Sequence, residues 1–97
     1  MNDTATPATL TVQVVYLARL REAFGASSER LPLQGISADA LTVADVLAAL
    51  ASRGGVFETE LAAGRAVRVA VNHALVSRDA RVRAGDEVAL LPPVTGG

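Results

Sequence analysis

The sequence predicts an α+β domain in which one main helix packs against one face of a mixed β-sheet. Three observations lead to this prediction: alternating β-branched residues over 10–17, an apolar stripe at helical spacing after Thr42, and strand-like segments over 67–71 and 87–91. A helix and a sheet that are each apolar on one side bury those sides against each other. The 97 residues are enough for one such domain.

The first half of the chain begins with a strand predicted from Leu10 to Leu17, whose side chains alternate between the two faces of the sheet. Good helix formers follow from Ala18 to Phe24, and Gly25 stands where a helix end favours a positive φ. A short strand is predicted from Glu29 to Leu33. Its Pro32 has no backbone N–H to donate, which favours an edge position in the sheet.

The main helix is predicted to begin at Thr42, after a loop over 34–41. The Thr42 hydroxyl can cap the first turn, and the carboxylate of Asp45 favours the positive end of the helix dipole. The apolar stripe consists of Val43, Val46, Leu47 and Leu50. A Gly-Gly pair at 54–55 is expected to end the helix, and a further turn or two is predicted over 56–63.

The second half of the chain predicts two or three more strands. The first runs from Val67 to Val71, a turn at 72–73 follows, and a short return segment covers 74–76. The last strand runs from Glu87 to Leu91 after a turn at 84–86. The core is expected to be built from aliphatic layers, because the chain has only three aromatic residues: Tyr16, Phe24 and Phe57.

Composition excludes several classes of protein. The net charge of −1 lacks the positive field of a nucleic-acid binder. All nine basic residues are Arg, so the chain has no ε-amine for a Schiff base or an isopeptide bond, and without Cys it has no disulfide and no thiolate. No apolar run approaches the roughly 20 residues of a membrane span, and residues 1–9 lack the pattern of a signal peptide. We therefore expect a cytoplasmic domain preceded by a disordered arm over 1–9.

Conventional side-chain sites are not predicted. The sequence has no Walker-type phosphate loop, and its one histidine, His73, stands in a predicted turn without the Cys partners of a typical zinc site. No metal site is expected. Structural roles on caps, loops and turns are assigned to the carboxylates of Asp39, Asp45, Glu58, Glu60 and Asp86. An exposed helix face, with docking as an alternative role, is assigned to Arg19, Arg21 and Glu22.

The chemistry is instead predicted at the C-terminal tail, over residues 92–97. Pro92 and Pro93 cannot donate backbone hydrogen bonds and so stop the last strand. An extended tail of this length spans about 20 Å, and its final Gly96 and Gly97 carry no side chains, so it can thread a narrow channel. The Gly97 carboxylate, with an intrinsic pKa of about 3.5, is ionised at neutral pH and is a poor electrophile. An external activating enzyme is therefore required.

Three segments resemble the family of molybdopterin synthase small subunits: residues 16–22, 71–72 and 85–97. The resemblance covers about residues 10–97, and the final segment is its specific part. It implies a ubiquitin-like β-grasp fold over 10–91, followed by a flexible tail over 92–97.

The resemblance also implies a defined reaction cycle. An E1-like adenylyltransferase activates Gly97 with ATP, and a sulfurtransferase system converts the acyl-adenylate to a thiocarboxylate. The tail then inserts into the large synthase subunit, which holds the catalytic residues, and donates sulfur to cyclic pyranopterin monophosphate. Two small and two large subunits form the complex, and this chain binds no permanent cofactor. The inserted residues are Pro92, Pro93, Val94, Thr95 and Gly96.

Strand parity predicts a partner-binding surface independently. The apolar residues that fall on the sheet face opposite the helix are Val15, Leu17, Ala70, Ala89 and Leu91, and Leu75 is expected to join them. An exposed apolar patch of this kind marks a partner surface. In ubiquitin-like proteins, as the resemblance implies, activating enzymes bind this face.

Three other functions stay open at this point. The first is a sulfur carrier for another product, such as the thiazole of thiamin. The second is a protein modifier that forms conjugates through Gly97, and the third is a binding module with an inert tail. Thiamin carriers are usually shorter and seldom end in Pro-Pro-Val-Thr-Gly-Gly. The sequence identifies neither the activating enzyme nor the sulfur donor.

Overall fold

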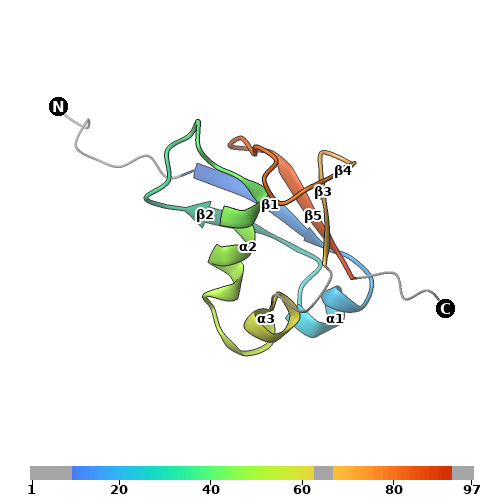
Figure 1. Cartoon of the computed structure of the whole chain (residues 1–97). Coiled ribbons are helices and arrows are strands. Elements are labelled where there is room, and N and C mark those ends of the chain that lie inside the picture. Colours follow the sequence, from blue (N-terminus) through green and yellow to red (C-terminus); the bar gives the residue numbers. More distant parts are fainter. Residues whose placement is uncertain (1–9, 63–66, 93–97) are drawn as a thin grey trace.

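The computed structural model describes residues 10–62 and 67–92, and within these ranges it contains five strands and three helices. In chain order the elements are β1 (Leu10–Tyr16), α1 (Arg19–Phe24), β2 (Ser28–Leu33), α2 (Val43–Ala51), α3 (Gly55–Glu60), β3 (Arg68–Val71), β4 (Ala74–Val76) and β5 (Glu87–Leu91). The predicted α+β architecture is confirmed: Figure 1 shows α2 against the sheet, with α1 and α3 close together.

The five strands form one mixed sheet in the order β2-β1-β5-β3-β4. β1 and β5 pair in parallel at the centre, and the other neighbouring strands pair antiparallel. β2 and β4 are the edge strands, so Pro32 of β2 lies at an edge, as its missing N–H predicts. The first and last described strands thus lie side by side, and the chain leaves the sheet from its middle.

The core lies between α2 and one face of this sheet. The four stripe residues of α2 are all buried, and so are Val12, Val14 and Tyr16 of β1. The hydroxyl of Thr42 accepts a hydrogen bond from the Asp45 backbone N–H, and the Asp45 carboxylate accepts one from the Thr42 backbone N–H, which completes a capping box. The predicted start of the main helix is confirmed.

Two helix ends differ from their predicted positions. α2 ends at Ala51, three residues before the Gly-Gly pair. Gly54 instead stands directly before α3, with a φ of 76°. Ala18 lies before α1 and not within it, at φ 54° and ψ −134°. This conformation lets the Leu20 N–H donate to the Leu17 carbonyl over 3.1 Å, so the chain turns sharply from β1 into α1.

The three aromatic residues gather at one end of the core, which the sequence did not predict. The Tyr16 and Phe24 rings lie 4.8 Å apart edge to face, and the Phe24 and Phe57 rings stack at 4.3 Å. Tyr16 is buried, and both Phe side chains pack partly buried against the aliphatic core. The cluster therefore joins β1, α1 and α3.

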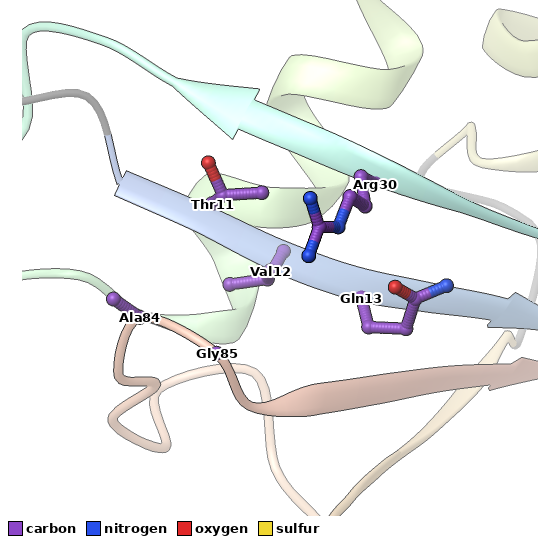
Figure 2. A pocket seen from close by; sticks show the side chains of 6 residues that line it. All are labelled: Thr11, Val12, Gln13, Arg30, Ala84 and Gly85. Atoms are coloured by element: carbon purple, nitrogen blue, oxygen red, sulfur yellow. The ribbon is translucent and has the colours of Figure 1, made fainter.

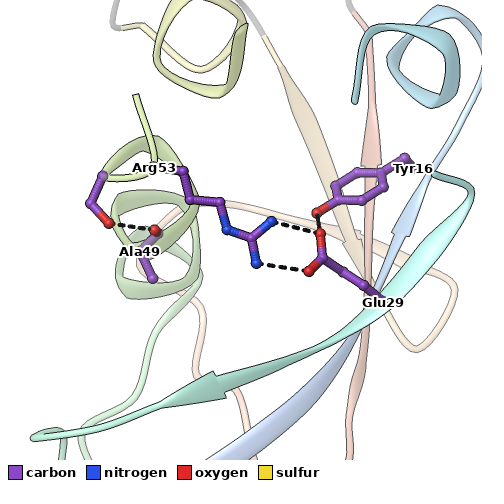
Figure 3. Close-up of polar contacts among 5 residues, drawn as sticks. Tyr16, Glu29, Ala49 and Arg53 are labelled. Carbon is purple, nitrogen blue, oxygen red and sulfur yellow. Dashed lines mark hydrogen bonds and ion pairs between the residues drawn. The ribbon is translucent and has the colours of Figure 1, made fainter. Parts of the chain in front are cut away.

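A polar network lies beside this aromatic cluster, with the Arg53 guanidinium 4.9 Å from the centre of the Phe57 ring. Figure 3 shows the members of the network: Tyr16, Glu29 and Arg53. Arg53 donates to both carboxylate oxygens of Glu29, at 2.8 and 2.7 Å, and the Tyr16 hydroxyl donates to the same carboxylate at 2.5 Å. The Arg53 hydrogen bonds lower the pKa of Glu29. Burial, followed by the contact with Glu29, raises the pKa of Tyr16 above its usual value. The network ties β1 and β2 to the segment between α2 and α3.

The lowered pKa of Glu29 predicts acid sensitivity. The stabilising contribution of this carboxylate is fully present above its unfolded pKa of 4.5 and is lost as the pH falls through the lower folded value. Urea unfolding of the wild type should therefore show a larger loss of stability between pH 7 and pH 3 than unfolding of Glu29→Gln. Equal losses in the two proteins would contradict this role of Glu29.

The buried stripe of α2 predicts a large cost for a cavity. Leu47 is only 4% exposed, so Leu47→Ala should lower the free energy of unfolding by about 2–5 kcal/mol, as measured by chemical denaturation. Leu75→Ala is the matched control, because the Leu75 side chain is 58% exposed and its truncation should change stability by less than about 0.5 kcal/mol. Similar costs for the two substitutions would refute the placement of the core.

The start of β5 is fixed by the turn between β3 and β4. Asn72 and His73 have positive φ values of 49° and 75°, which is typical of a tight hairpin. The Asn72 side chain accepts from the Glu87 N–H and donates to Asp86, while the Asn72 N–H donates to the Glu87 carbonyl at 2.8 Å. Both predicted turns, at 72–73 and 84–86, are confirmed, and their contact sets where β5 begins.

Candidate partner-binding face

The face of the sheet opposite α2, called the outer face below, carries a continuous apolar row across four strands. Val15 of β1 lies opposite Ala89 of β5, which lies opposite Ala70 of β3, which in turn lies opposite Leu75 of β4. Residues that are cross-strand partners point to the same side of a sheet. Side chains predicted from parity alone to share a face are thus direct neighbours.

A second apolar row follows at the end of β5. The Leu17 N–H donates to the Leu90 carbonyl over 3.1 Å, which extends the pairing of β1 with β5 by one residue. Leu91 lies on the outer face beside it, and Arg68 of β3 is the cross-strand partner of Leu91. The two rows together form the apolar patch, defined as Val15, Leu17, Ala70, Leu75, Ala89 and Leu91.

The apolar patch is separate from the core. In the described part of the chain none of its six residues belongs to the core cluster or packs against it. Leu75 is 58% exposed, and Val15, Leu17, Ala70 and Leu91 are partly exposed. Ala89 is only 6% exposed, because its small methyl group lies in the central strand between Val15 and Ala70. The structure places the predicted partner residues together, and their binding role stays a prediction.

The opposite end of the outer face is polar. Thr11 and Gln13 of β1 and Arg30 of β2 line a shallow hollow of about 460 Å³ together with Gly85. Figure 2 shows Arg30 extending from β2 over β1, between Thr11 and Gln13. The outer face is therefore polar at one end of the strands and apolar at the other, and the apolar end is the one at which the chain leaves β5.

The root of the predicted tail adjoins the apolar patch. β5 ends at Leu91, and Pro92 is the last residue that the structure describes. The predictions for Pro93, Val94, Thr95, Gly96 and Gly97 fall outside the described residues, as does the predicted arm over 1–9. What the structure gives is the position of the root, next to Leu91 and Leu17.

The other residues that the sequence singled out have structural partners. Asp86 accepts a hydrogen bond from the Arg83 N–H at 2.9 Å and stabilises its turn, as predicted. Arg19 forms an ion pair with Glu60 at 2.8 Å, so it joins α1 to α3 and is not purely solvated. The His73 side chain is 83% exposed. Within 10–62 and 67–92, no group of three or more His, Cys, Asp or Glu side chains is arranged to hold a metal ion.

No helix in the described ranges has the length and apolarity that a membrane crossing requires. The residues that sequence reasoning missed are Arg68, which lies beside the apolar patch, and the Tyr16, Glu29 and Arg53 network. Arg68 shares the outer face with Ala70 because side chains alternate along β3, and the strand register makes Leu91 its neighbour.

Comparisons with known proteins give the chain a family. The model of the ThiS family matches residues 14–97. The molybdopterin synthase sulfur carrier subunit of Escherichia coli is 35% identical over 86 residues, which is 89% of this chain and 99% of that protein. Among solved structures, SAMP1, the small archaeal modifier protein 1 of Haloferax volcanii, is 29% identical with a TM-score of 0.71, over 90% of this chain and 99% of that one.

A further solved structure, from Helicobacter pylori, is a complex of subunits 1 and 2 of the molybdopterin-converting factor. The matching chain is 22% identical, with a TM-score of 0.58 and coverage of 91% of this chain and all of that one, so this likeness concerns the fold. The neighbours confirm the ubiquitin-like β-grasp fold, and the family match and the curated relative confirm the resemblance seen in the sequence. The chain belongs to the ThiS family.

Proposed function

We propose that this protein is the sulfur carrier subunit of a molybdopterin synthase. The observation that carries the proposal is that the apolar patch adjoins the root of the Gly-Gly tail. A partner that covers Leu17 and Leu91 receives the tail at its own surface. The 35% identity to a molybdopterin synthase sulfur carrier subunit, over nearly the whole of that protein, supports this choice among carriers.

The reacting group of the proposed cycle is the carboxylate of Gly97. Its oxygen attacks the α-phosphorus of ATP on an E1-like enzyme, which forms an acyl-adenylate and releases pyrophosphate. Sulfur at the oxidation level of hydrosulfide, delivered by a sulfurtransferase together with a thiol reductant, then displaces AMP from the carbonyl carbon and leaves a thiocarboxylate. This sulfur is transferred to cyclic pyranopterin monophosphate inside the large synthase subunit. The carrier supplies no catalytic side chain and binds no permanent cofactor.

The proposed assembly combines this surface with the subunit arrangement that the family resemblance implies. The large synthase subunit covers the apolar patch and takes the tail, in a heterotetramer of two small and two large subunits. The complex of two subunits seen for the Helicobacter pylori fold neighbour supports a partner of this kind. The cycle is placed in the cytoplasm, where ATP is present.

The direct test is activation of Gly97. The purified E1-like enzyme of the same organism should catalyse ATP–pyrophosphate exchange with this chain, and intact mass after addition of a sulfur donor should rise by one oxygen-to-sulfur replacement. Gly96→Val should block the exchange or the later transfer, because a branched side chain obstructs a narrow channel, while thermal stability stays unchanged. No exchange, under conditions where a control carrier reacts, would favour the binding module with an inert tail.

A protein modifier is the second candidate, favoured by the likeness to the small archaeal modifier protein 1. The two functions differ in their products. A carrier accumulates as a free thiocarboxylate in its host, whereas a modifier is found joined through Gly97 to other proteins. Intact mass and immunoblots of the native host distinguish them, and a ladder of conjugates without free thiocarboxylate would select the modifier.

A further inference from the structure

The outer face carries a charged residue beside the part of the apolar patch from which the tail leaves. Arg68 of β3 lies on the outer face as the cross-strand partner of Leu91, next to the root of the tail. It is exposed, and within 10–62 and 67–92 it forms no ion pair. A partner that covers Leu91 therefore removes water from an unpaired guanidinium group.

Removing water from an unpaired charge is unfavourable unless the partner supplies a group of opposite charge. A guanidinium group pairs best with a carboxylate, because its N–H groups match the two carboxylate oxygens. The chemistry of Arg68 thus specifies one feature of the surface that docks on it.

The structure also provides a place for that carboxylate. A hollow of about 390 Å³ lies where β3 meets β4, and Arg68, Leu75 and Arg78 are among the residues that line it. Arg78, like Arg68, has no ion-pair partner among the residues that the structure describes. Leu75 and Val76 give the hollow an apolar wall, which suits the methylene groups of a Glu or Asp side chain.

We propose that this hollow, called the arginine hollow below, receives an acidic side chain of the large synthase subunit when that subunit covers the apolar patch. The inference rests on the proposed function for the identity of the partner. The arginine hollow adds a charge-specific contact beside the apolar patch. It selects partners that carry a carboxylate at this position and disfavours those that carry a cation there.

The other arginine of the outer face provides a matched control. Arg30 is also exposed on the outer face, but it lies at the polar end, beside Gln13, and lines a different hollow. If positive charge on the outer face favours association in a general way, replacing Arg30 should weaken binding as much as replacing Arg68. If a specific carboxylate contact is made, only replacement of Arg68 or Arg78 should weaken binding.

The experiment measures the affinity of the full-length chain for the purified large synthase subunit of the same organism. Arg68→Leu and Arg78→Leu should each weaken binding by roughly tenfold or more, since each removes one of the two guanidinium groups that the partner's carboxylate meets in the hollow. Arg30→Leu should change the affinity by less than about twofold, as expected for a charge outside the contact. In the synthase assay, the two hollow variants should raise the carrier concentration at half-maximal rate and leave the maximal rate unchanged.

Leucine is the informative replacement at Arg68. If the interface were apolar throughout, Arg68→Leu would extend the apolar patch and bind as tightly as the wild type or more tightly, and that result would overturn the inference. Equal weakening by Arg30→Leu would overturn it as well, because the effect would then be general. Restoration of Arg68→Glu binding by one Glu→Arg or Asp→Arg change in the large subunit would confirm the contact. Failure of the unsubstituted chain to bind the large subunit would instead refute the proposed function, and this inference with it.

Discussion

Chains that lack Gly97, or that carry one extra residue after it, are expected to lose sulfur transfer completely while the domain stays folded. In the proposed cycle the carboxylate of residue 97 is the only acceptor of AMP and sulfur. Shortening the tail by one residue withdraws the carboxylate by about 3.4 Å, more than an active site tolerates. Molybdopterin formation measures the loss, and circular dichroism measures the fold.

Gly97→Ala serves as the control for tail length. It keeps the carboxylate at residue 97 and adds a single methyl group, so its activity should exceed that of the shortened and the lengthened chains. Normal product formation by the chain without Gly97 would end the carrier hypothesis. An unfolded spectrum for that chain would contradict the predicted separation of the tail from the core of the β-grasp domain.

A charge within the apolar patch should have the second largest effect. Leu17→Asp or Leu91→Asp is expected to weaken binding to the large subunit or to the activating enzyme by roughly 10- to 100-fold, because the new carboxylate is desolvated in the interface. The fold should persist, since both side chains lie on the outer face and outside the core cluster. Titration calorimetry gives the affinity, and thermal unfolding gives the stability.

Thr11→Asp tests whether the position of the new charge matters. Thr11 lies on the same strand and the same face as Val15, but at the polar end beside the hollow of Arg30. A carboxylate there should leave binding nearly unchanged. If Leu17→Asp and Leu91→Asp unfold the domain, the assignment of the outer face is wrong, and if all three variants bind alike, the apolar patch is not the interface.

Periodicity was sufficient to predict the helices and strands whose conformation depends on residues close together in the sequence. In α2, the start of the helix is determined by the capping pair Thr42 and Asp45, and its buried side by the apolar stripe. Ala18 shows the limit of such reasoning. Its intrinsic preference is helical, yet the change of direction after β1 imposes a φ of 54°, a cost that packing of α1 against the rest of the fold offsets.

The candidate site was predictable in part for a related reason. Alternation along a strand states which face a residue occupies, so the apolar patch followed from parity. Alternation does not state which strands are neighbours, and the parallel pairing of β1 with β5 is what places Val15 beside Ala89. The network of Tyr16, Glu29 and Arg53 was not predicted for the same reason. Its members lie on β1, on β2 and after α2, and they come into contact only in the folded domain.

The central position of β5 has a consequence for how the protein is made. β5 is the last strand of the described chain to leave the ribosome, yet it fills the gap between β1 and β3. Until it emerges, the earlier strands lack the neighbour that joins them into one sheet, and folding waits for contacts between distant parts of the chain. A nascent or prematurely terminated chain without β5 therefore lacks the assembled apolar patch, and with it the surface proposed to bind a partner.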